Sequence, residues 1–186
     1  MIRLILGLGN PGQEYENTRH NSGRMAAEYF AKKMGFSDFE YDKKSNSLIS
    51  KSAQITVALP ETFMNKSGQA AAKLIRPKKE MKELIVIHDD LDLLLGRFKI
   101  SYGKSSGGHK GVESVMRALK TKNFVRIRVG VSPKHKPPQK EVIEFIVGKF
   151  KPSELEIFKK VLRKISDALE TIITDGYDRA MSEFNH

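Results

Sequence analysis

Residues 2–12 read IRLILGLGNPG, a short apolar run that ends in glycines and an Asn-Pro-Gly turn. A run of this kind is typical of a buried strand. Further strands are predicted at 55–59, 84–88 and 125–131, with weaker candidates at 39–51 and 97–102. Helical apolar patterns alternate with them, at 22–34, 70–75, 112–119 and 153–172. This alternation predicts an α/β fold: a single three-layer α/β/α domain over residues 1–186, with a central twisted mixed sheet.

Local signals also predict where two of the helices begin and end. Ser22 is the expected N-cap of the first helix, and Gly35 is expected to end it. Ser153 and Glu156 have the spacing of a capping box at the start of the last helix.

Composition and charge narrow the classes of function. The 186 residues contain no cysteine, which excludes disulfides and thiolate chemistry and favours a reducing cytosol. The apolar run near the N-terminus is too short for a signal peptide core or a membrane span. The net charge of +11 favours a polyanionic partner such as nucleic acid.

Gly7, Gly9 and Gly12 have the spacing G-x-G-x-x-G of a dinucleotide-binding turn. That turn requires a helix that opens inside the glycine run, where the pyrophosphate binds. Here the next residues, QEYENTRH, have no apolar face, so an NAD site is not expected. Asn10 instead lies at the carboxyl end of the first strand, where its amide offers a ligand both a donor and an acceptor.

His20 precedes the first helix, whose positive end disfavours imidazolium and so favours the neutral form that a general base needs. Asp89 follows a buried strand and could orient His20. Asp89, Asp90 and Asp92 could equally ligate Mg²⁺ in a nuclease, or form a solvated acidic loop. His88 is expected to be a core histidine. A G-x-S-x-G elbow and cysteine are both absent from the sequence, so a His/Asp pair that activates water remains the hydrolytic candidate.

The glycine-rich segment 103–111, GKSSGGHKG, is not a Walker loop. Its backbone N–H groups, Lys104, Lys110 and the start of the following helix are nevertheless suited to binding phosphate.

Four segments together resemble the bacterial-type peptidyl-tRNA hydrolases. They are GLGNPGQEYENTRHNSG (7–23), LPETFMNKSG (59–68), HDDLDLLLG (88–96) and SSGGHKG (105–111). The resemblance implies a monomeric cytosolic esterase that cleaves the bond between a peptide and the 3′ ribose of tRNA. It implies neither cofactor nor metal, and neither a membrane nor an obligate protein partner.

Carried over to this chain, the resemblance makes His20 the general base and Asp89 the group that stabilises its charged form. Asn10 is placed to bind the peptide and Asn65 to bind substrate and assist catalysis. Tyr15 and Phe63 match aromatic positions that contact the tRNA end.

Two positions depart from the family pattern: Lys110 stands where asparagine is usual, and Leu94 where proline is usual. Lys110 cannot accept a hydrogen bond, so we expect it to contact tRNA as a charge directed at phosphate. The alternative to an esterase is a tRNA- or RNA-binding module without catalysis. That alternative explains the charge but not the gathering of Asn10, His20, Asn65 and Asp89 at strand ends.

Overall fold

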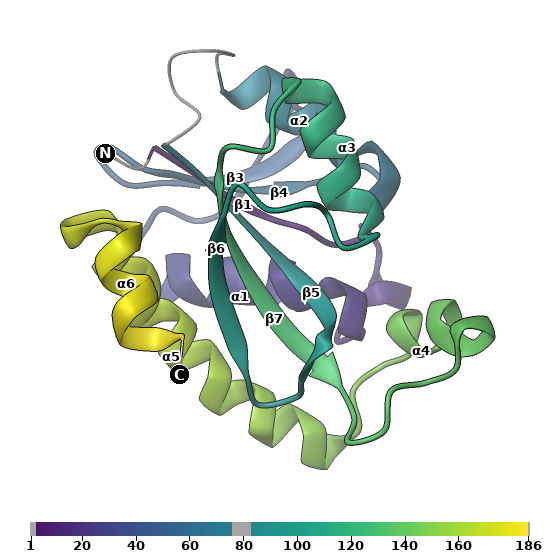
Figure 1. Cartoon of the computed structure of the whole chain (residues 1–186). Helices are drawn as coiled ribbons and strands as arrows, with labels where there is room; N and C mark the ends of the chain where they lie inside the picture. Colours follow the sequence, from purple (N-terminus) through teal and green to yellow (C-terminus); the bar gives the residue numbers. More distant parts are fainter. Residues whose placement is uncertain (1–2, 76–82, 186) are drawn as a thin grey trace.

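The computed structural model describes residues 3–75 and 83–185, which form a sheet covered by helices on both faces (Figure 1). The strands are β1 (Leu4–Gly7), β2 (Glu40–Asp42), β3 (Ser47–Lys51), β4 (Thr56–Pro60), β5 (Leu84–Leu94), β6 (Phe98–Tyr102) and β7 (Val125–Ser132). The helices are α1 (Ser22–Lys33), α2 (Ser67–Leu74), α3 (Lys110–Leu119), α4 (Val142–Val147), α5 (Pro152–Asp175) and α6 (Tyr177–Phe184). None of the described helices is both long enough and apolar enough to cross a membrane.

The strand order is β2-β3-β4-β1-β5-β7-β6, and the sheet is mixed. β1 runs parallel to both of its neighbours, β4 and β5, and β5 runs parallel to β7. β2, β3 and β6 are antiparallel to their partners. The predicted mixed α/β/α sheet is therefore confirmed.

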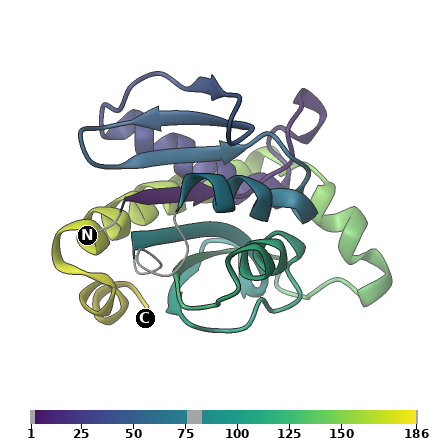
Figure 2. The same cartoon turned by 90° about the horizontal axis from the view of Figure 1, so that it is seen from above.

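Two apolar clusters make the three layers. On one face, α1, α5 and α6 pack against the sheet through residues such as Phe30, Ile165 and Ala180. On the other face, α2 and α3 pack against it through residues such as Ala71 and Val115. Figure 2, seen from above, shows helices on either side of the strands. The alternation of apolar side chains along β1 explains this arrangement, since Ile5 belongs to the first cluster and Leu4 and Leu6 to the second.

Several boundaries differ from the sequence-based expectation. β5 continues through Leu94, so that Asp89 and Asp90 lie inside the strand and pair with Val129 and Gly130 of β7. Helix α1 begins at Ser22 itself, with Asn21 as the preceding residue. The short helices α4 and α6 were not predicted, and the terminal His186 lies outside the described residues.

The capping box predicted at Ser153 and Glu156 is not formed, because Pro152 takes the first helical position of α5. Glu154 makes one half of a capping interaction, and the ammonium of Lys151 cannot accept the other half. Lys151 is consequently the residue that precedes the helix, and Glu154 accepts a hydrogen bond from its backbone N–H at 2.7 Å.

The topology determines where a site forms. After β1 the chain forms β4 on one side of β1, and it then forms β5 on the opposite side of β1. Parallel strands that diverge in this way leave a crevice at their carboxyl ends. The segments that follow β1 and β4, together with the outer half of β5, meet at this edge.

Candidate active site

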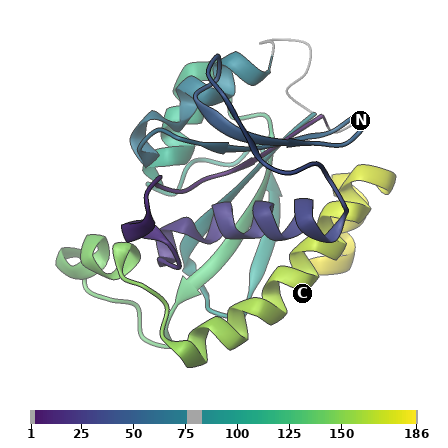
Figure 3. The ribbon, with the colours of Figure 1, turned by 180° about the vertical axis from the view of Figure 1, so that it is seen from behind.

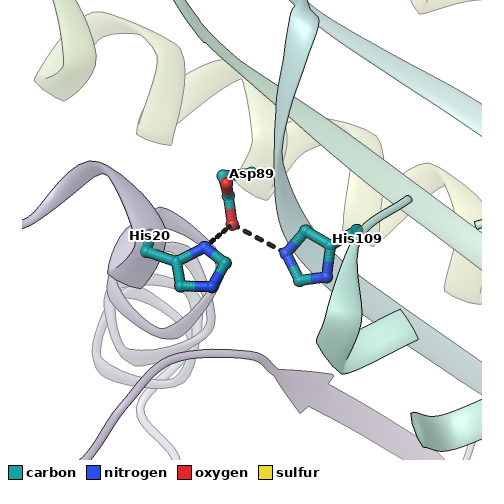
Figure 4. Close-up of side chains that lie close together, drawn as sticks. All are labelled: His20, Asp89 and His109. Atoms are coloured by element: carbon teal, nitrogen blue, oxygen red, sulfur yellow. Dashed lines mark hydrogen bonds and ion pairs between the residues drawn. The ribbon is translucent and has the colours of Figure 1, made fainter. Parts of the chain in front are cut away.

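The edge of the sheet holds a buried cluster of His20, Asp89 and His109 (Figure 4). Oδ1 of Asp89 lies 2.8 Å from Nδ1 of His20 and 2.8 Å from Nε2 of His109. His20 comes from a short 3₁₀ turn, η2 (Arg19–Asn21), that leads into α1. His109 is the residue immediately before α3. One carboxylate oxygen therefore joins three segments that are distant in sequence.

The hydrogen bonds assign a tautomer to each ring. Nδ1 of His109 accepts from the backbone N–H groups of Gly111 and Val112, at 3.1 and 3.2 Å. Its proton therefore resides on Nε2, which donates to Asp89. His20 donates to the same oxygen from Nδ1, which leaves a lone pair on Nε2. That atom has no hydrogen-bond partner among residues 3–75 and 83–185. The site thus presents one free imidazole nitrogen.

The cluster corrects the expectation that the helix start favours the neutral form of His20, because the net shift of the His20 pKa is upward. Burial by itself would lower the pKa of His20, but the charge of Asp89 and its hydrogen bond outweigh burial and raise it. Burial would raise the pKa of Asp89, but His20 and His109 hold it far below its usual range. Asp89 is therefore a carboxylate at neutral pH, and it favours the imidazolium that His20 becomes after taking a proton.

The geometry of the cluster disfavours a metal centre. A histidine ligates a metal through an unprotonated nitrogen. Nε2 of His109 would have to lose its proton to Nδ1, but Nδ1 already accepts two backbone N–H groups at the start of α3. The tautomer that α3 selects thus makes His109 a donor to Asp89 and not a ligand.

The three aspartates of the nuclease hypothesis do not converge. Asp89 bonds to the two histidines, whereas Asp90 pairs with Arg128 at 2.6 Å and Asp92 with Lys136 at 2.6 Å. Asp89 and Asp90 are neighbours in a strand, so their side chains lie on opposite faces of the sheet. Carboxylates that are each neutralised by a different cation do not form a Mg²⁺ site.

Asn10 is buried beside this cluster and is fixed by its neighbours. Its backbone N–H donates to Oδ1 of Asn21 at 2.8 Å, and its carbonyl accepts from Nδ2 of Asn21 at 2.9 Å. Its side-chain Oδ1 accepts from the backbone N–H of Met64 at 2.8 Å. Because the oxygen is occupied, the side-chain Nδ2 is left as the group that can donate to a ligand.

The other predicted site residues lie around the cluster without bonding to it. Asn65 follows Met64 in the turn η3 (Met64–Lys66), and its side chain is exposed. Tyr15 and Phe63 meet edge to face with their ring centres 6.4 Å apart, and Phe63 is 56% exposed. Lys110 is largely exposed and pairs with Glu113 at 3.2 Å.

Only some of the backbone N–H groups in the predicted phosphate-binding segment are available to bind phosphate. Two N–H groups at the start of α3 are already bound by the His109 ring, so the helix start offers fewer donors than expected, and phosphate binding by this segment stays a prediction. The same contact identifies His109, whose role the sequence-based reasoning missed. A histidine after two glycines at a helix start was the signal that could have found it. His88, by contrast, is buried as expected for a core histidine and donates from Nδ1 to a backbone carbonyl, but its Nε2 has no partner among residues 3–75 and 83–185.

A hollow of about 700 Å³ lies over β6 and β7, next to the Asp90 side of β5. Lys99 and Lys104 line it with exposed ammonium groups that have no partner among the described residues. Arg126, also in its lining, is buried, and its Nε has no hydrogen-bond partner among residues 3–75 and 83–185. Burial and the nearby Arg128 lower the pKa of Arg126 to about 10, so that it remains a cation. Three carboxylates, Asp90, Asp92 and Asp178, also line the hollow, so its four cations exceed its carboxylates by one and the hollow has a small positive excess.

Comparison with known proteins gives consistent matches over nearly the whole chain. The family model described as "Peptidyl-tRNA hydrolase" matches residues 4–186. A peptidyl-tRNA hydrolase of a Thermoanaerobacter species is 40% identical over 187 residues, which cover 98% of each chain. One of Dehalococcoides mccartyi is 38% identical and covers 99% of this chain and 100% of the relative. The crystal structure of peptidyl-tRNA hydrolase from Acinetobacter baumannii matches with a TM-score of 0.88 and 27% identity, over 99% of this chain and 94% of that chain.

Proposed function

The chain belongs to the peptidyl-tRNA hydrolase family, and on this premise we propose how its residues carry out the reaction. The chain is an ester hydrolase that cleaves peptidyl-tRNA into free peptide and tRNA. The observation that carries the mechanism is the Nε2 of His20, which has no partner within the described part of the chain. Nε2 carries no proton because Nδ1 of the same ring holds the proton and donates it to Asp89, which His109 also holds.

In the first step His20 acts as the general base. Its Nε2 takes a proton from a water molecule, and the resulting hydroxide attacks the ester carbonyl. Asp89 stabilises the imidazolium and keeps the ring in the tautomer that leaves Nε2 unprotonated beforehand. The proton is then returned to the 3′ oxygen of the ribose as the ester bond breaks. Covalent attack by the protein is not required.

Amide donors stabilise the negative charge that develops on the carbonyl oxygen. The Nδ2 group of Asn10 has no partner in the regions that the structure describes, and its orientation is fixed by the bond of Oδ1 to Met64. We assign to Asn65, on the adjacent turn, a second contact to the substrate. A fixed donor costs no reorganisation when charge appears, which is why donors of this kind lower the barrier.

The same Asn10 amide accounts for selectivity. A peptidyl ester has an amide carbonyl next to its last residue, whereas an unblocked aminoacyl ester has an ammonium at that place. An N–H donor binds the carbonyl and is left unpaired by the ammonium, so the wrong substrate loses a hydrogen bond.

The tRNA portion is held by stacking and by charge. The exposed Phe63 ring, supported edge-on by Tyr15, is suited to stack on an unpaired terminal base. The exposed Lys99 and Lys104 in the positive hollow are suited to bind phosphates of the acceptor end, with affinity but without sequence preference, and the buried Arg126 adds charge behind them. Lys110 adds a charge near the start of α3.

We further propose that residues 1–186 act as one domain, as a monomer, in the cytoplasm, without an obligate protein partner. Recycling of tRNA from prematurely released translation products is the role consistent with this activity.

One assay tests the activity and the base together. The protein is incubated with an N-acetylated aminoacyl-tRNA and with its unblocked counterpart, each with and without EDTA. We expect release of intact tRNA from the blocked ester only, insensitive to EDTA. Cleaved RNA, or binding without product, would contradict the esterase.

In the same assay His20→Ala should lower kcat by about 10²- to 10⁴-fold, because it removes the base. Binding of tRNA by His20→Ala should stay close to that of the unchanged protein, since the ring contacts water and not phosphate. Turnover that survives this substitution would contradict the general-base assignment.

A further inference from the structure

The turn that carries His20 is built from three consecutive buried polar residues, Arg19, His20 and Asn21. Each side chain bonds to a different part of the fold. His20 reaches Asp89 of β5, and Asn21 holds the backbone of Asn10. Arg19 reaches the corner where α4 ends and α5 begins. The mechanism above uses the first two attachments and leaves the third unexplained.

The guanidinium of Arg19 is enclosed by this corner, and its side chain is only 7% exposed. Nη1 donates to the carbonyl groups of Phe145, Gly148 and Lys149, at 3.4, 3.2 and 3.1 Å. Nη2 donates to Oε2 of Glu154 at 2.7 Å. The guanidinium also lies over the Phe145 ring, 4.3 Å from its centre. A cation beside the last carbonyls of α4 interacts favourably with the negative end of that helix.

The backbone next to Arg19 joins the same corner. The N–H of Arg19 donates to the carbonyl of Gly148 at 3.1 Å, and the N–H of Phe150 donates to the carbonyl of Asn17 at 2.9 Å. Thr18 and Lys149 form an antiparallel bridge between these two bonds. Figure 3 shows α4 beside the turn that leads into α1. The turn that carries His20 therefore contacts the α4–α5 corner on one side and β5 on the other.

Glu154 connects this contact to the start of α5. Its Oε2 accepts from the Lys151 backbone N–H as well as from Arg19. A buried guanidinium is costly unless its donors are satisfied. Here a carboxylate and three carbonyls accept from Nη1 and Nη2, while Nε has no hydrogen-bond partner among residues 3–75 and 83–185. An ammonium in the same place is a point charge and cannot hold these acceptors in a plane. The contact is therefore specific to arginine.

We propose that Arg19 is a positioning residue for the reaction: its guanidinium holds the His20 turn against the α4–α5 corner, so that the His20 ring stays aligned between Asp89 and the attacking water. This inference rests on the proposed role of His20 as general base. A displacement of about 1 Å at a reacting group can cost about a hundredfold in rate, so a fixed turn is needed for turnover and not only for folding.

The test compares Arg19→Lys and Arg19→Met with two controls in steady-state hydrolysis of N-acetylaminoacyl-tRNA. Arg179→Lys changes an exposed arginine that pairs with Glu183 on α6, so it controls for the chemical change. Ile172→Val makes a small cavity in buried α5 and controls for a loss of stability. Rates are measured well below the melting temperature of each variant.

For Arg19→Met we expect kcat to fall about ten- to hundredfold while KM for the tRNA changes by less than about twofold. Arg19→Lys should lie between it and the unchanged protein. The ¹⁵N signals of the His20 ring supply a second readout. They should report a single Nδ1–H tautomer in the unchanged protein and in both controls, and a mixture of tautomers in Arg19→Met.

If Arg19→Met does not fold, Glu154→Gln tests the same contact, because it keeps an acceptor and removes the charge. A several-fold fall in kcat with unchanged KM is expected for it. The proposal is overturned if kcat of the folded Arg19 and Glu154 variants equals that of Ile172→Val, or if only KM changes. The two proposals fail separately. Turnover that survives His20→Ala contradicts the base, whereas turnover that survives Arg19→Met, with His20→Ala inactive, contradicts only the role of Arg19.

Discussion

Asp89 accepts a hydrogen bond from His109 on the same oxygen, Oδ1, that His20 approaches. His109 is able to donate there because its other nitrogen is bound by two N–H groups of α3. The start of α3 thus determines which nitrogen of His109 carries the proton, and that proton is donated to Asp89. One side chain therefore both caps a helix and holds the catalytic carboxylate.

Replacement of His109 separates these two roles. His109→Asn retains a good N-cap for α3 but removes the donor to Asp89. We expect its melting temperature to stay close to that of the unchanged protein and its kcat to fall about tenfold, since Asp89 is then fixed by His20 alone. His109→Ala should lose stability as well. Full activity in His109→Asn, measured by hydrolysis of a blocked aminoacyl-tRNA, would show that His109 only caps the helix.

The pH dependence of activity follows from the pKa of His20, which Asp89 raises above the ordinary value of 6.5 against the effect of burial. A general base acts only when neutral, so activity should be lost as the pH falls through this raised pKa. The acidic limb of the kcat/KM profile should therefore lie above pH 6.5.

Asp89→Asn removes the charge and leaves the burial, so the pKa of His20 should fall below 6.5 and the limb should move to lower pH. The plateau should also fall, by about 10²-fold or more. An NMR titration of the ring protons measures the shift, with the exposed His135 as an internal control. A limb that moves to higher pH in Asp89→Asn would contradict the assignment.

Asn10→Asp tests the proposal that Asn10 binds the amide carbonyl of the peptide. It preserves the oxygen that accepts from the N–H of Met64 but replaces the Nδ2 donor by a second acceptor. We expect kcat/KM for the N-acetylated substrate to fall about ten- to hundredfold, because a buried hydrogen bond is lost. The unblocked ester should be cleaved faster than before, because its ammonium is attracted to the carboxylate.

Asn123→Asp is a matched control for this change, since it adds the same charge in the exposed loop before β7. It should leave the ratio of the two substrates unaltered. An unaltered ratio in Asn10→Asp as well would assign selectivity to another group.

Lys99→Ala tests the positive hollow. If Lys99 binds a phosphate, its removal should raise KM without changing kcat. It should also reduce the slope of log KM against log salt concentration by about 1. Lys159→Ala removes an exposed lysine that pairs with Glu156 on α5 and should change neither quantity. A slope that remains unchanged in Lys99→Ala would place the acceptor end of the tRNA elsewhere.

Much of the fold could be predicted from local pattern. The apolar runs of β1, β5 and β7 and the amphipathic helices α1, α3 and α5 follow from residue periodicity, which depends only on neighbours in sequence. The extension of β5 through Leu94 could not be predicted in this way. Asp89 and Asp90 are poor strand formers, and they are held extended by pairing with β7.

The sequence by itself determined the α/β class, the position of Asn10 just after the first strand and of His20 just before the first helix, and the residues available for acid–base chemistry. These depend on local patterning and side-chain type. Only the tertiary structure decided which of those residues work together. It brought His109 and His20 to one oxygen of Asp89, paired Asp90 and Asp92 with separate cations, and packed Arg19 into the α4–α5 corner. Hydrogen-bond partners distant in sequence are chosen by the packing of helices on a sheet, and no local pattern encodes that choice.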